Sequence, residues 1–271
     1  MTTLRIVQIT DTHLSQDFPQ FWPNFDRIVA NVNDEAPHLV INTGDIACNG
    51  PDSDAELEFA ARRHRAINAP FLAVPGNHDI GEEPPGQPAK QYIDAPRRSR
   101  WHRYFGHDWW AIGFGAWRII GINSQLMGSG IEAEELQWAW LEQELAEAAD
   151  RPVAIFQHKP PFREDPHRPA SFDDFRCMTA AARERYAALI APSSVRFISC
   201  GHSHIHRKTR WLDKDVYWAP PASAVEDAAT GPNGHPGYAR FDFTGSDVRI
   251  RFVFPLECDL IDFNDMHAGA L

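Results

Sequence analysis

The sequence predicts an α/β protein in which layers of sheet and helix are stacked. Short runs of strand-forming residues alternate with helix-like segments through about the first two hundred residues. After His204 the strand-like runs are joined by Gly- and Pro-rich turns without a long helix, which indicates a second sheet. In addition, Asp, His and Asn residues, whose side chains can bind metal or transfer protons, come just after five strand-like runs. Open α/β sheets bind their ligands beyond such carboxyl ends.

The composition is typical of a globular chain, and we expect one domain over residues 1–271. Of the 271 residues, 43% are hydrophobic and 23% are charged, which is sufficient for a large core. No apolar run reaches the roughly 18 residues of a membrane span, so we expect no membrane insertion. The formal net charge of -11 disfavours nucleic acid and anionic lipid as partners.

The cysteines and the N-terminus favour a cytoplasmic location. The chain shows no export signal, because its first residues enter a strand at once. The four cysteines lie far apart and form no CxxC pair, which argues against disulfides and a zinc ribbon. We therefore expect reduced thiols in or near the core, at Cys48, Cys177, Cys200 and Cys258.

The first strand is predicted over residues 4–9, which are mostly apolar β-formers. It leads to Asp11 and His13, two residues apart, whose side chains can converge on one ion. The following residues 25–32 have apolar side chains at helical spacing, and Pro37 ends this predicted helix.

Residues 38–42 form the second predicted strand. After it, Gly44 allows a sharp turn and leaves the Asp45 carboxylate free to project. Residues 52–67 read as a helix with acidic residues in the first turn and arginines near the end, which complements the helix dipole.

The third predicted strand, residues 71–74, leads to the turn Gly76-Asn77-His78-Asp79. Residues 82–106 are rich in Pro and Gly and then in Arg and aromatic residues. We expect them to form a loop or small cap over the site, in which Trp101 and Tyr104 could cover a nucleobase.

A hairpin is predicted over residues 109–122, with Gly113 and Gly115 near its turn. Residues 132–148 form an amphipathic helix with glutamates facing outward. Its inward residues are predicted to be Leu136, Trp140, Leu141 and Leu145.

The next predicted strand covers residues 152–156 and exits at His158. Residues 163–172 form a polar, proline-containing segment, and residues 175–191 a helix.

The strand over residues 195–200 exits at Gly201-His202-Ser203-His204, which brings two imidazoles to a strand end. Residues 211–256 are expected to form the C-terminal part of the second sheet. Its strand-like runs are residues 216–219, 238–243 and 248–254.

Seven side chains from the five strand exits could bind metal together. The set contains two carboxylates, four imidazoles and one amide, which suits Zn²⁺, Mn²⁺ or iron better than Ca²⁺ or a copper–thiolate site. Seven ligands are too many for one ion. If one carboxylate bridges, they form two four-ligand sets, which describes two ions roughly 3.5–4 Å apart. The candidates are Asp11, His13, Asp45, Asn77, His158, His202 and His204.

Each motif has a plainer interpretation when it is taken alone. An Asp-x-His pair occurs by chance, Gly-Asn-His-Asp is a turn-forming sequence, and His202 and His204 are compatible with two surface histidines. Their occurrence together at five strand exits favours the metal centre. For the other histidines we expect surface or hydrogen-bonded roles.

These motifs together resemble the signature of the calcineurin-like metallophosphoesterases. The wording around Asp11 and His202 is most similar to bacterial class III cyclic nucleotide phosphodiesterases and their glycerophosphodiesterase relatives. The resemblance implies a four-layer αββα sandwich of two mixed β-sheets flanked by helices. The motifs on which this resemblance is based are Asp11-x-His13, Gly44-Asp45, Gly76-Asn77-His78-Asp79, His158 and Gly201-His202-x-His204.

The resemblance also implies a role for each residue. The first metal would take Asp11, His13 and His204, the second Asn77, His158 and His202, and Asp45 would bridge both. His78 would face the substrate phosphate, and Asp79 would orient His78, so that the catalytic residues are Asp45, His78 and Asp79. The substrate would touch His13, Asp45, Asn77, His78 and His204.

The implied function is hydrolysis of a small phosphodiester, with a 3′,5′-cyclic nucleotide first, by attack of a metal-bound hydroxide. The cofactors would be two divalent ions, Mn, Fe or Zn. Glycerophosphodiesters, phosphonate monoesters and phosphomonoesters would use the same ligands, with specificity set by residues 82–106 and 163–172. A catalytically silent metal-binding scaffold is the alternative from another class. A homodimer is expected from the similar phosphodiesterases.

Overall fold

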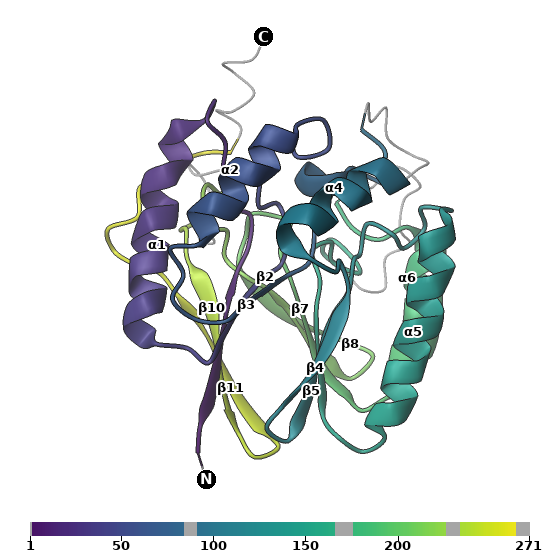
Figure 1. Ribbon diagram of the computed structural model, residues 1–271. Helices are drawn as coiled ribbons and strands as arrows, with labels where there is room; N and C mark the ends of the chain where they lie inside the picture. Colours follow the sequence, from purple (N-terminus) through teal and green to yellow (C-terminus); the bar gives the residue numbers. More distant parts are fainter. Residues whose placement is uncertain (1, 84–90, 166–175, 226–233, 264–271) are drawn as a thin grey trace.

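The chain folds into two mixed β-sheets that pack face to face, with helices on their outer faces (Figure 1). This computed structural model describes residues 2–83, 91–165, 176–225 and 234–263. Helix α1 (Trp22–Glu35) covers one sheet, and helices α5 (Glu132–Ala148) and α6 (Ala180–Ile190) cover the other. The layers therefore run helix, sheet, sheet, helix, and the predicted four-layer sandwich is confirmed.

The first sheet has five strands in the order β11-β10-β1-β2-β3. The three N-terminal strands are parallel, and β10 pairs with the other edge of β1 in antiparallel register. Because parallel strands run in one direction, their carboxyl ends meet at one edge of the sheet. The strands are β1 (Leu4–Ile9), β2 (Leu39–Asn42), β3 (Phe71–Ala73), β10 (Tyr238–Thr244) and β11 (Asp247–Val253).

The second sheet has six strands in the order β4-β5-β6-β7-β9-β8. The four inner strands are parallel, and β4 and β8 pair antiparallel at the two edges. The predicted hairpin is the pair β4–β5. The strands are β4 (Trp110–Phe114), β5 (Trp117–Gly121), β6 (Val153–Phe156), β7 (Val195–Cys200), β8 (Arg207–Trp211) and β9 (Lys214–Trp218).

The C-terminal strands divide between the two sheets, and the prediction that residues 211–256 all belong to the second sheet is wrong. Strand β9 does pair with β7 there, but β10 and β11 add to β1 of the first sheet. Strand β8 is absent from the predicted strands because its sequence, RKTRW, is mostly charged and lies at a sheet edge.

Three hydrophobic clusters hold the layers together. The first packs α1 and α2 (Asp54–His64) on the first sheet and includes the fully buried Ile28. The second packs α5 and α6 on the second sheet through side chains such as Leu141. The third lies between the sheets, where Phe197 stacks on Phe241 at 5.3 Å. Burial of a side chain of this size stabilises the fold by about 1.5–3 kcal/mol.

Helix α5 buries most of the predicted face, since Leu141 and Leu145 are buried and Trp140 packs against the cluster on the second sheet. Trp138, Leu141 and Leu145 are buried at helical spacing, whereas Leu136 is 60% exposed. Leu136 and Leu141 are separated by about 1.4 helical turns, so they point in nearly opposite directions. The prediction for Leu136 is therefore wrong.

Part of the predicted cap is a helix packed into the core. Helix α4 (Ala95–Phe105) begins at Asp94, which caps it, and packs against α2. Trp101 is fully buried and stacks on Phe105 at 4.4 Å, so it is not a surface for a nucleobase. Residues 84–90 of the expected cap and 166–172 of the expected specificity segment lie outside the described residues.

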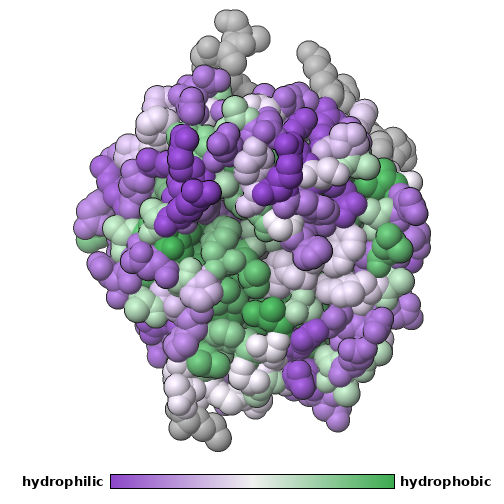
Figure 2. Space-filling view, in the orientation of Figure 1, coloured by the Kyte–Doolittle hydropathy of each residue, from purple (hydrophilic) through white to green (hydrophobic). Residues whose placement is uncertain are grey.

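One face of the molecule carries a hydrophobic area surrounded by hydrophilic side chains (Figure 2). This is the face on which edge strand β4 lies in Figure 1. Trp110, Ile112 and Phe114 of β4 are partly buried against the cluster between the sheets. The core between the sheets therefore continues to the surface at this edge.

The cysteines match their prediction. All four are free, and three of them are buried. Among the helices in the described part of the chain, none combines the length and the apolar character that crossing a membrane requires.

Candidate metal centre

The loops after β1 and β2 lie side by side. The amide of Asp11 donates to the carbonyl of Gly44, and the amide of His13 donates to the carbonyl of Asp45, each over 2.9 Å. Gly44 has a φ of +99°, and a Cβ atom there would lie 2.5 Å from the amide nitrogen of Gly76. Glycine at position 44 therefore lets the loop after β3 pack closely against this pair.

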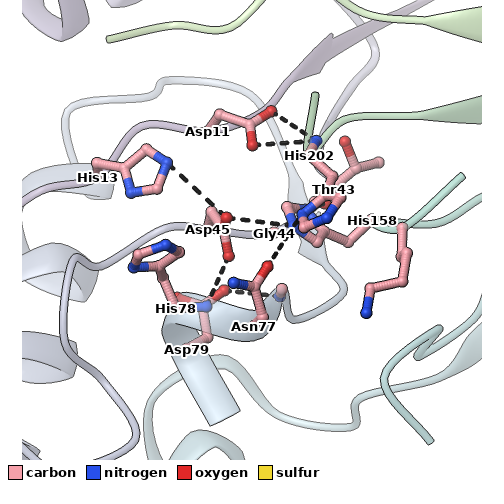
Figure 3. A network of polar contacts seen from close by, with 12 residues as sticks. Asp11, His13, Thr43, Gly44, Asp45, Asn77, His78, Asp79, His158 and His202 are labelled. Atoms are coloured by element: carbon pink, nitrogen blue, oxygen red, sulfur yellow. Dashed lines mark hydrogen bonds and ion pairs between the residues drawn. The ribbon is translucent and has the colours of Figure 1, made fainter. Parts of the chain in front are cut away.

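The loops after β6 and β7 reach the same place from the second sheet. The amide of Gly201 donates to the carbonyl of His158 over 3.0 Å, and the amide of His202 donates to both carboxylate oxygens of Asp11 over 3.1 and 3.2 Å. The hydroxyl of Ser223 donates to the carbonyl of Asp11 over 2.6 Å. Hydrogen bonds thus join the strand exits of both sheets into one site (Figure 3).

Five of the seven candidate ligands have a left-handed backbone. Only a few per cent of non-glycine residues adopt positive φ, and each sparsely populated conformation costs about 1–3 kcal/mol. Their concentration here is typical of a functional site. The φ values are +54° for Asp11, +43° for His13, +52° for Asp45, +72° for His202 and +51° for His204.

The ligand atoms of six of the seven candidates, together with those of His78, form three overlapping groups, each with all atoms within 4.8 Å of one another. Asp45 belongs to two groups and lies in the middle of the site (Figure 3). Its Oδ2 is 3.8 Å from His13 Nε2 and 3.2 Å from His158 Nε2. Asn77 adjoins them, with Oδ1 3.1 Å from His158 Nε2. The groups are Asp11, His13 and His204; His13, Asp45 and His78; and Asp45, His158 and His202.

The imidazole tautomers fit metal binding. His158 Nδ1 donates to the carbonyl of Thr43 over 2.9 Å, and His204 Nδ1 donates to the carbonyl of Ala224 over 2.7 Å. When either ring is neutral, its Nε2 atom therefore carries the lone pair and presents it to the site. The Nε2 atoms of His204 and His13 lie 3.0 Å apart. Lone pairs this close repel one another unless a proton or a cation lies between them.

The charges also favour a cation. Burial alone would raise the pKa of Asp45, but the imidazoles of His158 and His78 lower it well below its ordinary value. Burial would lower the pKa of His158, but the charge of Asp45 raises it to about 9. Burial, and next to it the charge of His78, lowers the pKa of His13 well below its ordinary value. The buried negative charge of Asp45 thus requires a positive partner, which the protonated His158 ring supplies here and which a metal ion would supply in its place.

Asp79 has a different role from the predicted one. The ring of His78 is held by the carbonyl of Cys48, 2.8 Å from Nδ1, and not by Asp79. Asp79 accepts hydrogen bonds from the amides of Ile46, Ala47 and Gly76 over 2.9–3.0 Å. Its carboxylate therefore joins the loop that carries Asp45 to the start of helix α3 (Asn77–Ile80).

His64, which belongs to none of the sequence motifs, supports the loop that carries Asp45. His64 is buried, with Nδ1 2.8 Å from the carbonyl of Ala60 and Nε2 3.0 Å from Nδ2 of Asn42. Burial lowers the pKa of His64 to about 4, so the ring is neutral and accepts from Asn42. Asn42 Oδ1 in turn accepts from the amide of Gly44. The hydrogen-bonded role expected for such histidines is confirmed here.

Lys159 is a further residue that motif analysis missed. It follows His158, is fully buried, and has Nζ 2.6 Å from Glu82 and 2.7 Å from Glu83. This ion-paired cluster fixes the exit of β6 to the segment after α3. The only sequence signal is a lysine directly after a strand-exit histidine.

The fold and this site define a class of protein. Two mixed sheets whose strand exits gather carboxylates, an amide and four imidazoles around a shared aspartate are the arrangement of a metal-dependent hydrolase. The model of the calcineurin-like phosphoesterase family matches residues 4–206, and the chain belongs to that family. It is therefore a hydrolase of phosphoric esters, as the resemblance implies.

Curated relatives agree with this membership. The chain is 30% identical over 230 residues to the glycerophosphodiester phosphodiesterase GpdQ of Enterobacter lignolyticus, covering 79% of this chain and 76% of the relative. It is 27% identical over 235 residues to the 3′,5′-cyclic adenosine monophosphate phosphodiesterase CpdA of Escherichia coli K12, covering 82% and 77%.

Solved structures confirm the fold. A dimetal phosphatase from Danio rerio superposes with a TM-score of 0.63 at 16% identity, over 96% of this chain and 99% of that one. The purple acid phosphatase PPD1 of yellow lupin superposes with a TM-score of 0.68 at 14% identity, over 98% of this chain and 55% of that one.

Proposed function

We propose that this protein is a dinuclear metal-dependent phosphodiesterase for a small phosphodiester, with a 3′,5′-cyclic nucleotide as the first candidate. The observation that carries the proposal is the set of three overlapping ligand groups, two of which contain Asp45. A phosphodiester is an anion that repels hydroxide, so two adjacent cations suit its hydrolysis. The relatives GpdQ and CpdA are both named for phosphodiesters.

The chain offers ligands for two ions. We assign Asp11, His13 and His204 to one ion, Asn77, His158 and His202 to the other, and Asp45 to both. Nitrogen and oxygen donors of this kind accept Mn, Fe or Zn. Such ions, when bound, neutralise phosphate charge and lower the pKa of a water molecule.

His78 is the proposed substrate-facing residue. Its ring lies edge-on to His13, with centroids 4.8 Å apart, and its amide donates to Asp45 Oδ1 over 2.8 Å. Because Nδ1 is occupied by the Cys48 carbonyl, Nε2 remains for the phosphate or the leaving oxygen. The residues proposed to touch the substrate are His13, Asp45, Asn77, His78 and His204.

A glycerophosphodiester is the second candidate, since the relative at 30% identity is named for that substrate. Phosphonate monoesters and phosphomonoesters would use the same ligands. A silent metal-binding scaffold is disfavoured because His78 accompanies all seven ligands.

A substrate panel tests the proposal. After loading with Mn²⁺, the protein should hydrolyse bis(p-nitrophenyl) phosphate faster than p-nitrophenyl phosphate. It should then prefer one of the 3′,5′- and 2′,3′-cyclic nucleotides to glycerophosphodiesters. Asn77→Ala should lower kcat/KM about a hundredfold, because a metal ligand is lost. Asn31→Ala, on α1, is the control and should retain activity.

Two results would contradict the proposal. A preference for the monoester would remove the diesterase assignment. Turnover of no ester by the loaded protein would favour the scaffold.

A further inference from the structure

The chain after β11 forms a strap, residues 255–263, that crosses α1 and ends beside the metal centre. Asn24 on α1 is fully buried, and it accepts from the amide of Asp259 over 2.7 Å and donates to its carbonyl over 2.8 Å. Arg27, almost one turn further along α1, lies 2.6 Å from the Asp259 carboxylate. Helix α1 therefore fixes the course of the strap, drawn in yellow beside it (Figure 1).

The strap then pairs with the loop that supports His204. The amide of Val225 donates to the carbonyl of Ile261, and the amide of Phe263 donates to the carbonyl of Val225, each over 2.9 Å. The carbonyl of the preceding residue, Ala224, accepts from His204 Nδ1. The backbone of Ala224 and Val225 therefore holds both the end of the strap and the His204 ring.

Phe263 lies against three imidazoles of the centre. Its ring centroid is 4.1 Å from that of His204, 4.9 Å from that of His13 and 6.3 Å from that of His78, to which it is perpendicular. The side chain is partly exposed. Phe263 thus adds an aromatic surface to a centre made of carboxylates and imidazoles.

We propose that Phe263 is a specificity-determining residue that favours phosphate esters with an aromatic or heteroaromatic group. This inference rests on the proposed function, because it takes the phosphate to lie between the metal ions and His78. The organic group of the ester then extends past the His78 ring, where Phe263 lies. An aryl group or a nucleobase stacks on a phenyl ring, whereas a glycerol group has no face to stack. The inference therefore places cyclic nucleotides before glycerophosphodiesters.

Two phosphonates that differ in one group test the inference through binding alone. Isothermal titration calorimetry of the Mn²⁺-loaded protein would compare phenylphosphonate with methylphosphonate. Phe263→Ala should weaken the binding of phenylphosphonate about three- to tenfold and should change the Kd of methylphosphonate by no more than about twofold. Phe263→Tyr should keep the preference for phenyl, and Phe263→Leu, which retains volume without an aromatic face, should lose most of it.

A matched control is Phe254→Ala, which removes a phenyl ring that packs on His206 at 4.7 Å instead of on the ligands. This variant should bind both phosphonates with the affinity of the wild type. Equal changes for the two phosphonates in Phe263→Ala, or tighter binding of both, would overturn the inference. If the wild type hydrolyses diesters but Phe263→Ala has no selective effect, this inference alone fails. If the wild type hydrolyses no diester, the proposed function fails.

Discussion

At the scale of single residues, five candidate ligands at the strand exits have a backbone with positive φ, a conformation that most residues avoid. Asp and His tolerate positive φ better than most residues, so the types that bind metal also fit these turns. The conformational cost is offset by hydrogen bonds between the exits, such as the one from the Asp11 amide to Gly44. The ligands are therefore held in place before any metal binds.

Asp79 acts by positioning these turns. The two oxygens of its carboxylate accept hydrogen bonds from three backbone amides. An Asn side chain has only one oxygen that can accept such hydrogen bonds. We expect Asp79→Asn to weaken Mn²⁺ binding about 10- to 100-fold, because the loops of Asp45 and Asn77 lose their common support. Isothermal titration calorimetry measures this change.

His78→Ala is the comparison for Asp79→Asn. It removes the ring that we propose faces the substrate, so kcat should fall while the affinity for Mn²⁺ stays close to that of the wild type. Unchanged metal affinity in Asp79→Asn would show that the turns do not depend on this carboxylate.

At this scale the sequence predicts the candidate metal ligands because each one lies within four residues of the end of a strand. The role of Asp79 could not be predicted from its place beside His78. As the third residue of helix α3, it turns back and accepts from the amide of Gly76, the residue before the helix, which is one of the two hydrogen bonds of a capping box. Phe263 could not be predicted because the strap carries no motif and reaches the site only through contacts with α1.

At the scale of elements, local patterns predict the strands but not their partners. β10 has buried residues that alternate along the strand, which is compatible with either sheet. Its place beside β1 depends on packing between distant parts of the chain. In α5 the predicted Leu141 and Leu145 are buried, but the predicted face included Leu136, which is exposed, and omitted Trp138, which is buried.

Helix α4 is joined to the end of β5 by one buried carboxylate. Asp108 accepts two hydrogen bonds from Arg98, over 2.8 and 3.0 Å, and one from Asn123 over 2.8 Å, and lies 2.8 Å from His102 Nε2. Burial alone would raise the pKa of Asp108, but the hydrogen bonds from His102 and Arg98 outweigh it and lower the pKa below its ordinary value of 3.8.

This lowered pKa predicts a pH-dependent contribution to stability. The contribution is present above the ordinary pKa and is lost as the pH falls towards the lower value of the folded state. Asp108→Asn should reduce the free energy of unfolding at pH 7 by about 3 kcal/mol, and the deficit should shrink near about pH 3. Urea unfolding at both pH values measures it.

The control for this prediction is Asp213→Asn, since the Asp213 side chain is 99% exposed. It should change stability little at either pH. A deficit in Asp108→Asn that is equal at both pH values would show that ionisation of Asp108 does not stabilise the fold.

At the scale of the whole molecule, both sheets contribute to the candidate metal centre, the first with four of the seven candidate ligands, including His13 after β1, and the second with three. Asp11, Asp45 and Asn77 follow strands of the first sheet, whereas His158, His202 and His204 follow strands of the second. An ion held by both sets would join the two sheets at their carboxyl ends, beyond the hydrophobic cluster that lies between them. Metal binding should therefore be coupled to the stability of the whole fold.

Thermal unfolding tests this coupling. A ligand that binds only the folded state stabilises it by about 2.7 kcal/mol at a hundred times its Kd. For a chain of this size we expect Mn²⁺ to raise the Tm of chelator-treated protein by about 5–10 °C. Asp45→Asn should lose most of this rise, because both ions lose a ligand, whereas Asp108→Asn should unfold at a lower temperature but keep the rise. An equal rise in wild type and Asp45→Asn would mean that Mn²⁺ binds elsewhere, since no other carboxylate in the described part of the chain belongs to two of the ligand groups.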